Sequence, residues 1–164
     1  MIERTLVLVK PDGVQRQIIG EILTRFEKAG LKIVGLKLVW ADEEFARKHY
    51  TEDIEIRRGK AVRDYNVNFI KSGPVVALAL EGVNAIENVR KMVGSTEPKS
   101  AQPGTIRGDY SHVSYAYCDS KKQVVKNLIH ASSDAKDAAH ELALWFSKEE
   151  LHTYKTVHDV HILD

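Results

Sequence analysis

The stretch Thr5-Leu6-Val7-Leu8-Val9-Lys10-Pro11-Asp12-Gly13 is a short apolar run that ends in a turn sequence. Its length and its β-branched residues predict a buried strand over residues 5–9 rather than a helix. Pro, Asp and Gly are typical of tight turns, so Lys10 should stand at the end of this strand. This first turn lacks the glycine-rich pattern of doubly wound parallel sheets, which disfavours such a sheet.

Several segments that follow this strand in the sequence also have clear patterns. Apolar residues at helical spacing predict a helix from Ile18 to Phe26, which Gly30 ends. Alternation predicts a strand over 31–40, and a continuous apolar run predicts a buried strand over 75–80. The other predicted elements are a helix from Asp42 to about Tyr50, a helix over 83–93 that ends at Gly94, a strand over 127–130 and a helix over 135–146.

Other segments are less regular. Residues 51–65 are rich in charge and predict a solvated loop that leads into a short helix. Residues 95–109 predict a long loop, a kind of segment that is often functional. Residues 110–126 and the tail from Ser147 to Asp164 show no clear periodicity.

The order of the elements, β α β α (α) β α β α, is not a strict alternation of strand and helix. It predicts an α+β protein with the ferredoxin-like split βαβ arrangement, in which helices cover one face of a four-stranded antiparallel sheet. A doubly wound parallel sheet is the alternative. At 164 residues the chain has the usual size of one domain, so we expect a single domain over 1–164.

Composition and charge bear on several function classes. The chain has 24 basic and 23 acidic residues and a net charge of +1, which gives no support to a nucleic-acid partner. No apolar run approaches the roughly 20 residues that span a membrane, and the start of the chain lacks a signal-peptide pattern. The single cysteine, Cys118, allows no internal disulfide. We therefore expect a cytoplasmic protein without membrane contact.

His130 is the first candidate for chemistry, because it stands at the end of a predicted strand and small polar residues follow it. A histidine there could be a base, a metal ligand or a nucleophile, or simply a partly buried side chain. A metal site built from His158 and His161 is a weaker possibility. A serine hydrolase built on Ser132 is disfavoured, because His130 lies only two residues earlier on a strand and turn.

Basic groups from separate segments accompany this histidine. Lys10 ends a strand, whereas Arg90, Thr96 and Arg107 surround the long loop. Guanidinium groups suit phosphate oxygens. A histidine with an ordinary pKa near 6.5 is mostly neutral at cytoplasmic pH and can accept a phosphoryl group, provided that a carboxylate or similar group fixes its other nitrogen. The residues therefore favour phosphoryl transfer.

The sequence resembles nucleoside diphosphate kinases over nearly its whole length, to about residue 155. The resemblance is carried by Glu3-Arg4-Thr5, Val9-Lys10-Pro11-Asp12-Gly13-Val14-Gln15-Arg16, Gly20-Glu21-Ile22, Arg25-Phe26-Glu27, His49-Tyr50, Ser72-Gly73-Pro74-Val75-Val76, Glu81-Gly82, Pro103-Gly104-Thr105-Ile106-Arg107-Gly108-Asp109 and Asn127-Leu128-Ile129-His130-Ala131-Ser132. Several independent blocks in one order make this a specific signal.

The resemblance implies the ferredoxin-like fold and the transfer of a γ-phosphate from nucleoside triphosphates to nucleoside diphosphates. It implies a ping-pong route through phosphohistidine, with little base selectivity. Mg²⁺ would be held through the nucleotide phosphates, without metal ligands from the protein. The family assembles as homo-oligomers, and a hexamer is expected rather than a tetramer.

Site roles also follow from the resemblance. His130 would be the nucleophile, Glu141 the carboxylate that orients its ring, and Ser132 a nearby support. Arg90, Thr96 and Arg107 would bind phosphates. Lys10 and Asn127 would contact the sugar hydroxyl, and Lys10 would also contact the transferred phosphate. Tyr50 would border the phosphate site.

The sequence departs from the family pattern in three places. The acid after the nucleophile turn is displaced by one residue, to Asp134. Residues 51–65 lack the phenylalanine that usually covers the base, and Tyr65 or Val62 are candidates to replace it. The segment from Asp109 to Asn127 is longer than usual. An alternative function is therefore a nucleotide-binding regulatory module on the same fold with little turnover.

Overall fold

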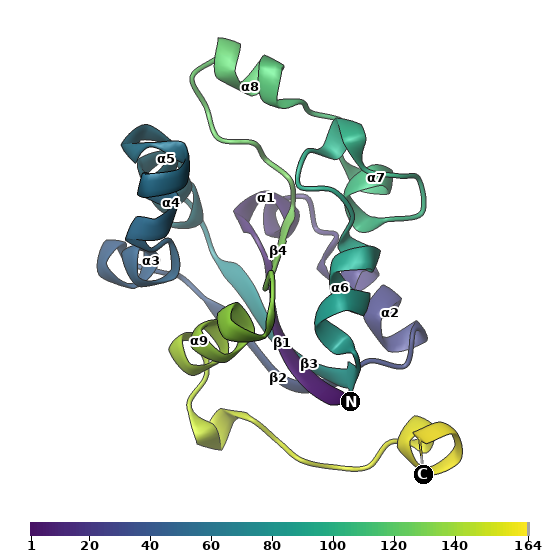
Figure 1. Cartoon of the computed structure of the whole chain (residues 1–164). Helices are drawn as coiled ribbons and strands as arrows, with labels where there is room; N and C mark the ends of the chain where they lie inside the picture. Colours follow the sequence, from purple (N-terminus) through teal and green to yellow (C-terminus); the bar gives the residue numbers. More distant parts are fainter. Residues whose placement is uncertain (164) are drawn as a thin grey trace.

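The computed structural model describes residues 1–163 and contains one four-stranded sheet (Figure 1). Its strands are β1 (Ile2–Val9), β2 (Lys32–Val39), β3 (Val75–Val83) and β4 (Ile129–Ala131). They run in the order β2-β3-β1-β4, and every neighbouring pair is antiparallel. This confirms the α+β ferredoxin-like prediction and excludes the parallel alternative.

Helices cover both faces of the sheet, so the expectation of one covered face was wrong. In β1, Val7 and Val9 join the core that includes Phe26, whereas Leu6 and Leu8 join the core that includes Trp145. A strand buried on both faces has a continuous apolar run, as β1 and β3 do. The first core contains residues of α2 (Ile19–Lys28) and α6 (Ala85–Val93); the second contains residues of α3 (Glu43–His49), α5 (Lys60–Ile70) and α9 (Ala135–Trp145).

Short helices fill the segments that the sequence left unassigned or predicted as turns. The proline turn after β1 is the start of α1 (Pro11–Gln15), which fits the preference of proline for the first helical turn. The predicted charged loop over 51–65 is instead α4 (Glu52–Arg58) and the start of α5, separated at Gly59, whose φ is +88°. The later segments contain α7 (Ile106–Tyr110) and α8 (Tyr115–Ser120), together with 3-10 turns at Pro98–Ser100 and Lys148–Glu150.

The tail after α9 runs back beside β2 and ends in a π-helical turn (Asp159–Leu163; Figure 1). The backbone N–H of His152 donates to the carbonyl of Val34 at 2.8 Å, and Lys32 binds Asp159 at 3.1 Å. His158 packs where a side chain on Gly30 would otherwise lie, so its position is explained by packing. Within residues 1–163, the groups of three potential metal ligands include neither His158 nor His161.

None of the helices in the described part of the chain is long and apolar enough to cross a membrane.

Candidate active site

His130 lies inside β4, opposite Leu8 of β1, and not at the strand end that the sequence predicted. Its Nε2–H donates to Oε1 of Glu141 at 2.8 Å, while the Ser132 hydroxyl donates to Oε2 of the same carboxylate at 2.5 Å. Ser132 in turn accepts the backbone N–H of Leu6 at 3.3 Å. This chain of contacts fixes the ring of His130 and leaves its Nδ1 without a hydrogen-bond partner within residues 1–163.

The charge on Glu141 is retained at neutral pH. Burial alone would raise the pKa of this carboxyl, but the charge and the hydrogen bond of His130 outweigh burial and lower the pKa to about 2. An ionised carboxylate accepts hydrogen bonds and does not donate them. The proton of a neutral His130 therefore stays on Nε2, and the lone pair of Nδ1 faces away from Glu141.

His49 packs against the ring of His130, with the two ring centres 4.7 Å apart and the planes nearly perpendicular. Its Nδ1 accepts the indole N–H of Trp145 at 3.3 Å, and its Nε2 is buried without a partner in the described chain. Burial, reinforced by the charge of His130, lowers the pKa of His49 to about 3. His49 is therefore uncharged at neutral pH, and its ring limits the movement of the His130 ring.

A strained turn leads into β4. Leu128 has a φ of +71°, and the N–H of Ile129 donates to the carbonyl of Asn127 at 2.8 Å, which closes a γ-turn. A positive φ is unfavourable for a bulky residue. Two contacts hold the turn: the N–H of Leu128 donates to Asp12 Oδ2 at 2.9 Å, and its carbonyl accepts the N–H of Lys10 at 2.8 Å.

This turn places Asn127 beside Lys10. The Lys10 ammonium donates to the Asn127 side-chain oxygen, and the Asn127 amide donates to the carbonyl of Thr96 at 2.7 Å. Burial lowers the pKa of Lys10 to about 8; Asp12 opposes this shift and Arg107 adds to it. The strand-end lysine is thus a buried and readily titrated cation.

Arg107 is held by the backbone. It is 7% exposed, and its guanidinium donates to the carbonyls of Asn127, Gly94 and Ile129 at 3.2, 3.0 and 2.6 Å. Burial lowers its pKa to about 10, which still leaves it charged at neutral pH. A buried cation fixed at three points is suited to bind an anion without rearrangement.

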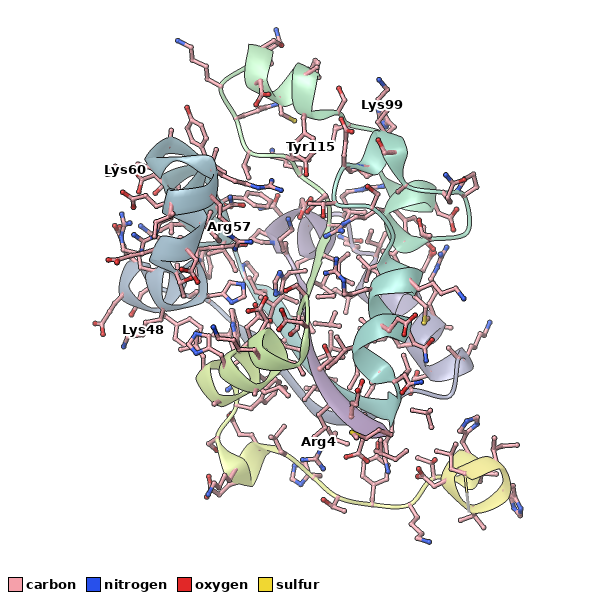
Figure 2. All side chains as sticks on the ribbon, viewed as in Figure 1. Arg4, Lys48, Arg57, Lys60, Lys99 and Tyr115 are labelled. Atoms are coloured by element: carbon pink, nitrogen blue, oxygen red, sulfur yellow. The ribbon has the colours of Figure 1, made fainter. Side chains whose placement is uncertain are left out.

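Two adjoining cavities border this constellation. The inner cavity, about 250 Å³, is lined by Lys10, Tyr50, Ile54, Arg57, Arg58, Val62, Asn66, Thr96, Arg107, Asn127, Ile129 and His130. The outer cavity, about 530 Å³, is lined by Lys10, Arg58, Val62, Tyr65, Asn66, Thr96, Tyr115, Asp119, Lys122, Gln123, Val124, Val125 and Asn127. Figure 2 shows Arg57 on α4 and Tyr115 at the start of α8. These two helices lie on the two sides of the site.

The structure therefore brings six of the predicted site residues together around the inner cavity: Lys10, Tyr50, Thr96, Arg107, Asn127 and His130. Glu141 and Ser132 support His130. Arg90 is the exception, because it lies exposed on the last turn of α6 and lines neither cavity, although it is near enough to Arg107 to lower the pKa of that group.

The displaced acid has a structural position. The Asp134 carboxylate caps α9 by accepting the N–H of Asp137 at 2.9 Å. Asp and Ser are both good N-cap residues, so the changed order Ser133-Asp134 still starts the helix that carries Glu141.

Sequence reasoning missed three contributors. Arg57 and Arg58 line the inner cavity, but the charge-rich pattern of 51–65 was interpreted as a solvated loop. Because the chain has other candidate phosphate-binding residues, the positive charge of Arg57 and Arg58 could have indicated that they belong to the same site. His49 was quoted only as a neighbour of Tyr50, and no sequence pattern indicated that it would pack on His130.

Comparisons with known proteins agree with this geometry. The family model for nucleoside diphosphate kinase matches residues 3–151. A nucleoside diphosphate kinase from Pyrococcus horikoshii is 51% identical over 158 residues, which cover 96% of this chain and 93% of the relative.

Solved structures are similar as well. One is a transition-state mimic of nucleoside-diphosphate kinase from Borrelia burgdorferi with bound vanadate and ADP; it has a TM-score of 0.94 and 45% identity, covering 96% of this chain and 95% of that one. Another, from Halobacterium salinarum in complex with CDP, has a TM-score of 0.84 and 42% identity, covering 98% of this chain and 97% of that one. The chain belongs to the nucleoside diphosphate kinase family and is a phosphotransferase that acts on nucleotides.

Proposed function

We propose that the phosphate passes through Nδ1 of His130 in a ping-pong exchange between nucleotides. The observation that carries this proposal is the bond from Nε2–H of His130 to the ionised Glu141, made at the edge of a cavity lined by cations. The bond orients the ring and keeps the nucleophilic lone pair on Nδ1.

In the first half-reaction, Nδ1 forms a bond to the γ-phosphorus while the bond from that phosphorus to the β–γ bridging oxygen breaks. The nucleoside diphosphate leaves with the electron pair. The imidazole ring becomes positive, and the Glu141 carboxylate stabilises this charge through Nε2–H. In the second half-reaction, a terminal oxygen of another nucleoside diphosphate attacks the same phosphorus and the N–P bond breaks.

The inner cavity supports binding of the phosphates. Lys10, Arg57, Arg58 and Arg107 are its charged side chains, and among residues 1–163 no carboxylate lines it. Thr96 and Tyr50 add hydroxyl groups to the lining that includes His130. Lys10 and Asn127, which contact each other in the same lining, would bind the sugar hydroxyl. Arg90 lines neither cavity, so it would contact the nucleotide phosphates only from outside the inner cavity. The Borrelia burgdorferi relative has vanadate and ADP bound, which supports nucleotide binding by this chain.

The donor set also fits the expected Mg²⁺, held through the nucleotide. Mg²⁺ prefers oxygen ligands, and none of residues 1–163 brings a carboxylate to the inner cavity for a dedicated protein site. When bound, Mg²⁺ neutralises charge on the phosphate oxygens. The cluster of His49, His130 and Glu141, whose candidate ligand atoms lie within 4.8 Å, has nitrogen donors that suit transition metals better.

The test is to incubate the protein with Mg-ATP labelled at the γ-phosphate. We expect acid-labile, base-stable label at His130, a ³¹P resonance of phosphate on Nδ1, and transfer of the label to added CDP. His112→Ala is a matched control because His112 is an exposed histidine outside both cavities.

His130→Ala should abolish both the label and the transfer, by roughly 10⁴-fold or more. Nucleotide binding without any label in the natural sequence would instead support the regulatory module. Transfer by His130→Ala at the natural rate would refute the proposed nucleophile.

The same proposal includes a homo-oligomer, with a hexamer expected over a tetramer. It is supported by the exposed apolar side chains of the edge strand β2 and its end: Leu36, Leu38 and Trp40 are 52%, 63% and 68% exposed. Light scattering on the purified chain would measure its mass. We also propose that 1–164 acts as one cytoplasmic domain; Asp164 lies outside the described residues.

A further inference from the structure

A third cavity, of about 710 Å³, is lined mainly by residues of α3, α4 and α9. It adjoins the inner cavity, because Arg57 and His130 line both. Unlike the inner cavity, it is also lined by His49 and Glu141. A small ion in the third cavity can therefore reach His130 together with the two side chains that pack on it and orient it.

The charges of the third cavity do not exclude a cation. Two of its basic side chains, Arg47 and Arg63, form ion pairs with Asp64 and Glu55. Four carboxylates also belong to the lining: Glu52, Asp53, Asp137 and Glu141.

Three atoms that can bind a metal lie close together beside this cavity. The candidate ligand atoms of His49, His130 and Glu141 lie within 4.8 Å of one another. Oε1 of Glu141 is 2.8 Å from Nε2 of His130 and 3.8 Å from Nδ1 of His49. Two ligand atoms of a tetrahedral zinc site are about 3.3 Å apart, because each bond is about 2.0–2.1 Å long. The two measured separations bracket this value, so adjustments of the side chains suffice to form a site.

The surroundings of His49 leave a lone pair on the nitrogen nearest to Glu141. The indole N–H of Trp145 can only donate, so Nδ1 of His49 accepts it and the ring proton is on Nε2. That Nε2 is buried without a partner within residues 1–163, which is unfavourable for a polar group. Packing against His130 alone would be served by an apolar ring. The imidazole at this position therefore suggests a ligand.

The chemistry of the donor set identifies the class of ion. Two imidazole nitrogens and one carboxylate oxygen are the protein ligands of many zinc sites, in which water occupies the fourth position. The third cavity has room for that water. Mg²⁺ prefers a shell of oxygen atoms and is not suited to two nitrogen ligands.

We propose that His49, His130 and Glu141 bind Zn²⁺ from the third cavity and that the bound ion inhibits phosphate transfer. Zinc takes the lone pair of Nε2 of His130 once the ring proton has moved from Nε2 to Nδ1, so the ring neither gains nor loses a proton overall. Nδ1 then carries a hydrogen and has no lone pair with which to attack phosphorus. The inhibition rests on the function proposed above, whereas the binding of zinc does not.

The first experiment measures binding of Zn²⁺ alone to the metal-free, nucleotide-free chain by calorimetry. We expect one ion per chain with a dissociation constant of about 1 μM, weaker than four-ligand structural sites because water occupies one position. Nitrogen-15 spectra of labelled histidines should show the proton of His130 on Nε2 without zinc and on Nδ1 with it. Absence of binding at about 100 μM zinc, or a tautomer that does not change, would overturn the proposal.

Variants then locate the ion. His49→Asn offers an oxygen to the indole N–H of Trp145 but no imidazole, and His49→Phe keeps a ring for packing. Each should weaken zinc binding more than about 100-fold, beyond the usual effect of a group that only supports a ligand. His140→Ala is the matched control, because His140 is an exposed histidine of the same cavity outside the cluster. Natural affinity in both His49 variants, or an equal loss in His140→Ala, refutes the site.

The phosphohistidine assay separates the two proposals. One equivalent of zinc should reduce labelling of His130 by more than about tenfold, and a chelator that removes zinc but leaves Mg²⁺ should restore it. Labelling of His49→Asn should not respond to zinc. Full labelling of the natural chain with zinc bound refutes the inhibition alone. Zinc binding with the expected tautomer change, in a chain that never takes up label, refutes the phosphohistidine mechanism alone.

Discussion

The inner and outer cavities share Lys10, Thr96 and Asn127, yet they are built in opposite ways. Most of the reactive groups of the inner cavity stand on or beside the sheet and are buried or held by neighbours, as Arg107 is by three carbonyls. The outer cavity is formed by helical and loop surface, where Tyr65 is 39% exposed. Under the proposed function, the difference teaches that rigid positioning for chemistry comes mainly from the sheet, whereas the surface of the outer cavity would contact the nucleotide base.

The first prediction tests the inner cavity. Among changes that keep the His130 nucleophile, it has the largest expected effect. Glu141→Gln preserves shape but removes the charge that fixes and stabilises the His130 ring. We expect kcat to fall about 10- to 100-fold, with nucleotide affinity unchanged. Steady-state kinetics and calorimetry measure the two quantities, with the exposed Glu44→Gln as control. A loss of affinity at constant kcat would contradict this division of roles.

The second prediction concerns pH at the shared residue Lys10. Because its folded pKa is lowered from 10.5 to about 8, Lys10 in the free protein is charged below about pH 8 and loses its proton above it. KM for the triphosphate should therefore rise severalfold as pH increases through 8, since the inner cavity loses a cation. Lys10→Arg, whose group stays charged, should remove this pH dependence even if it lowers the overall rate.

The same shift affects stability in the opposite direction. Between about pH 8 and 10.5 the unfolded chain binds a proton at Lys10 that the folded chain has released. The contribution of Lys10 to the free energy of unfolding thus increases as pH rises through this range. Denaturant titrations of the natural chain and Lys10→Met across that range would measure it; an identical pH dependence in both would contradict the lowered pKa.

The third prediction tests the outer cavity. Tyr65→Ala removes an aromatic surface from the outer cavity, and the loss of base stacking should raise KM about fivefold while kcat at saturation is retained. Tyr117→Ala is the matched control, because Tyr117 is an exposed tyrosine of α8 that does not line the cavity. A fall in kcat of the size expected for Glu141→Gln would show that the two cavities do not divide their roles in this way.

The smallest expected effect on turnover is at the helix cap. Asp134→Ala removes the acceptor for the N–H of Asp137 and should lower the free energy of unfolding by about 1 kcal/mol. Turnover should stay within twofold of the natural value, because Asp134 touches neither cavity. Asp134→Ser should restore most of the stability in denaturant titrations. A large loss of activity with normal stability would instead indicate a direct role in the site.

The parts of the fold that the sequence predicted are those with strong periodicity. Buried strands, and helices such as the one that Asp42 caps through the N–H of Phe45 at 2.8 Å, have local patterns that tertiary contacts did not override. The continuous apolar runs of β1 and β3 are typical of strands buried on both faces, whereas the predicted arrangement covered only one face of the sheet. Helix α4 was missed because its surface position gives it no buried residue and therefore no apolar stripe.

The candidate site was predicted as a set of residues but not as a geometry. Blocks of sequence led to His130, Lys10 and Asn127, yet they did not indicate that Leu128 would adopt a positive φ between them. Nor did they indicate that Arg90 would line neither cavity, whereas Arg57 and Arg58 line the inner one. These positions depend on contacts between segments far apart in the chain, which a single sequence does not contain.

The turn at Leu128 sets a limit for anyone who engineers this chain. Its backbone favours glycine or asparagine, but its side chain is 1% exposed and packs in the core, so the two requirements select different residues. Relieving the φ would gain about 1–2 kcal/mol, whereas deleting a buried leucine side chain costs roughly 2–5 kcal/mol. A search for thermostable variants should therefore return the natural leucine at this position, and improvements in heat tolerance will have to come from other parts of the chain.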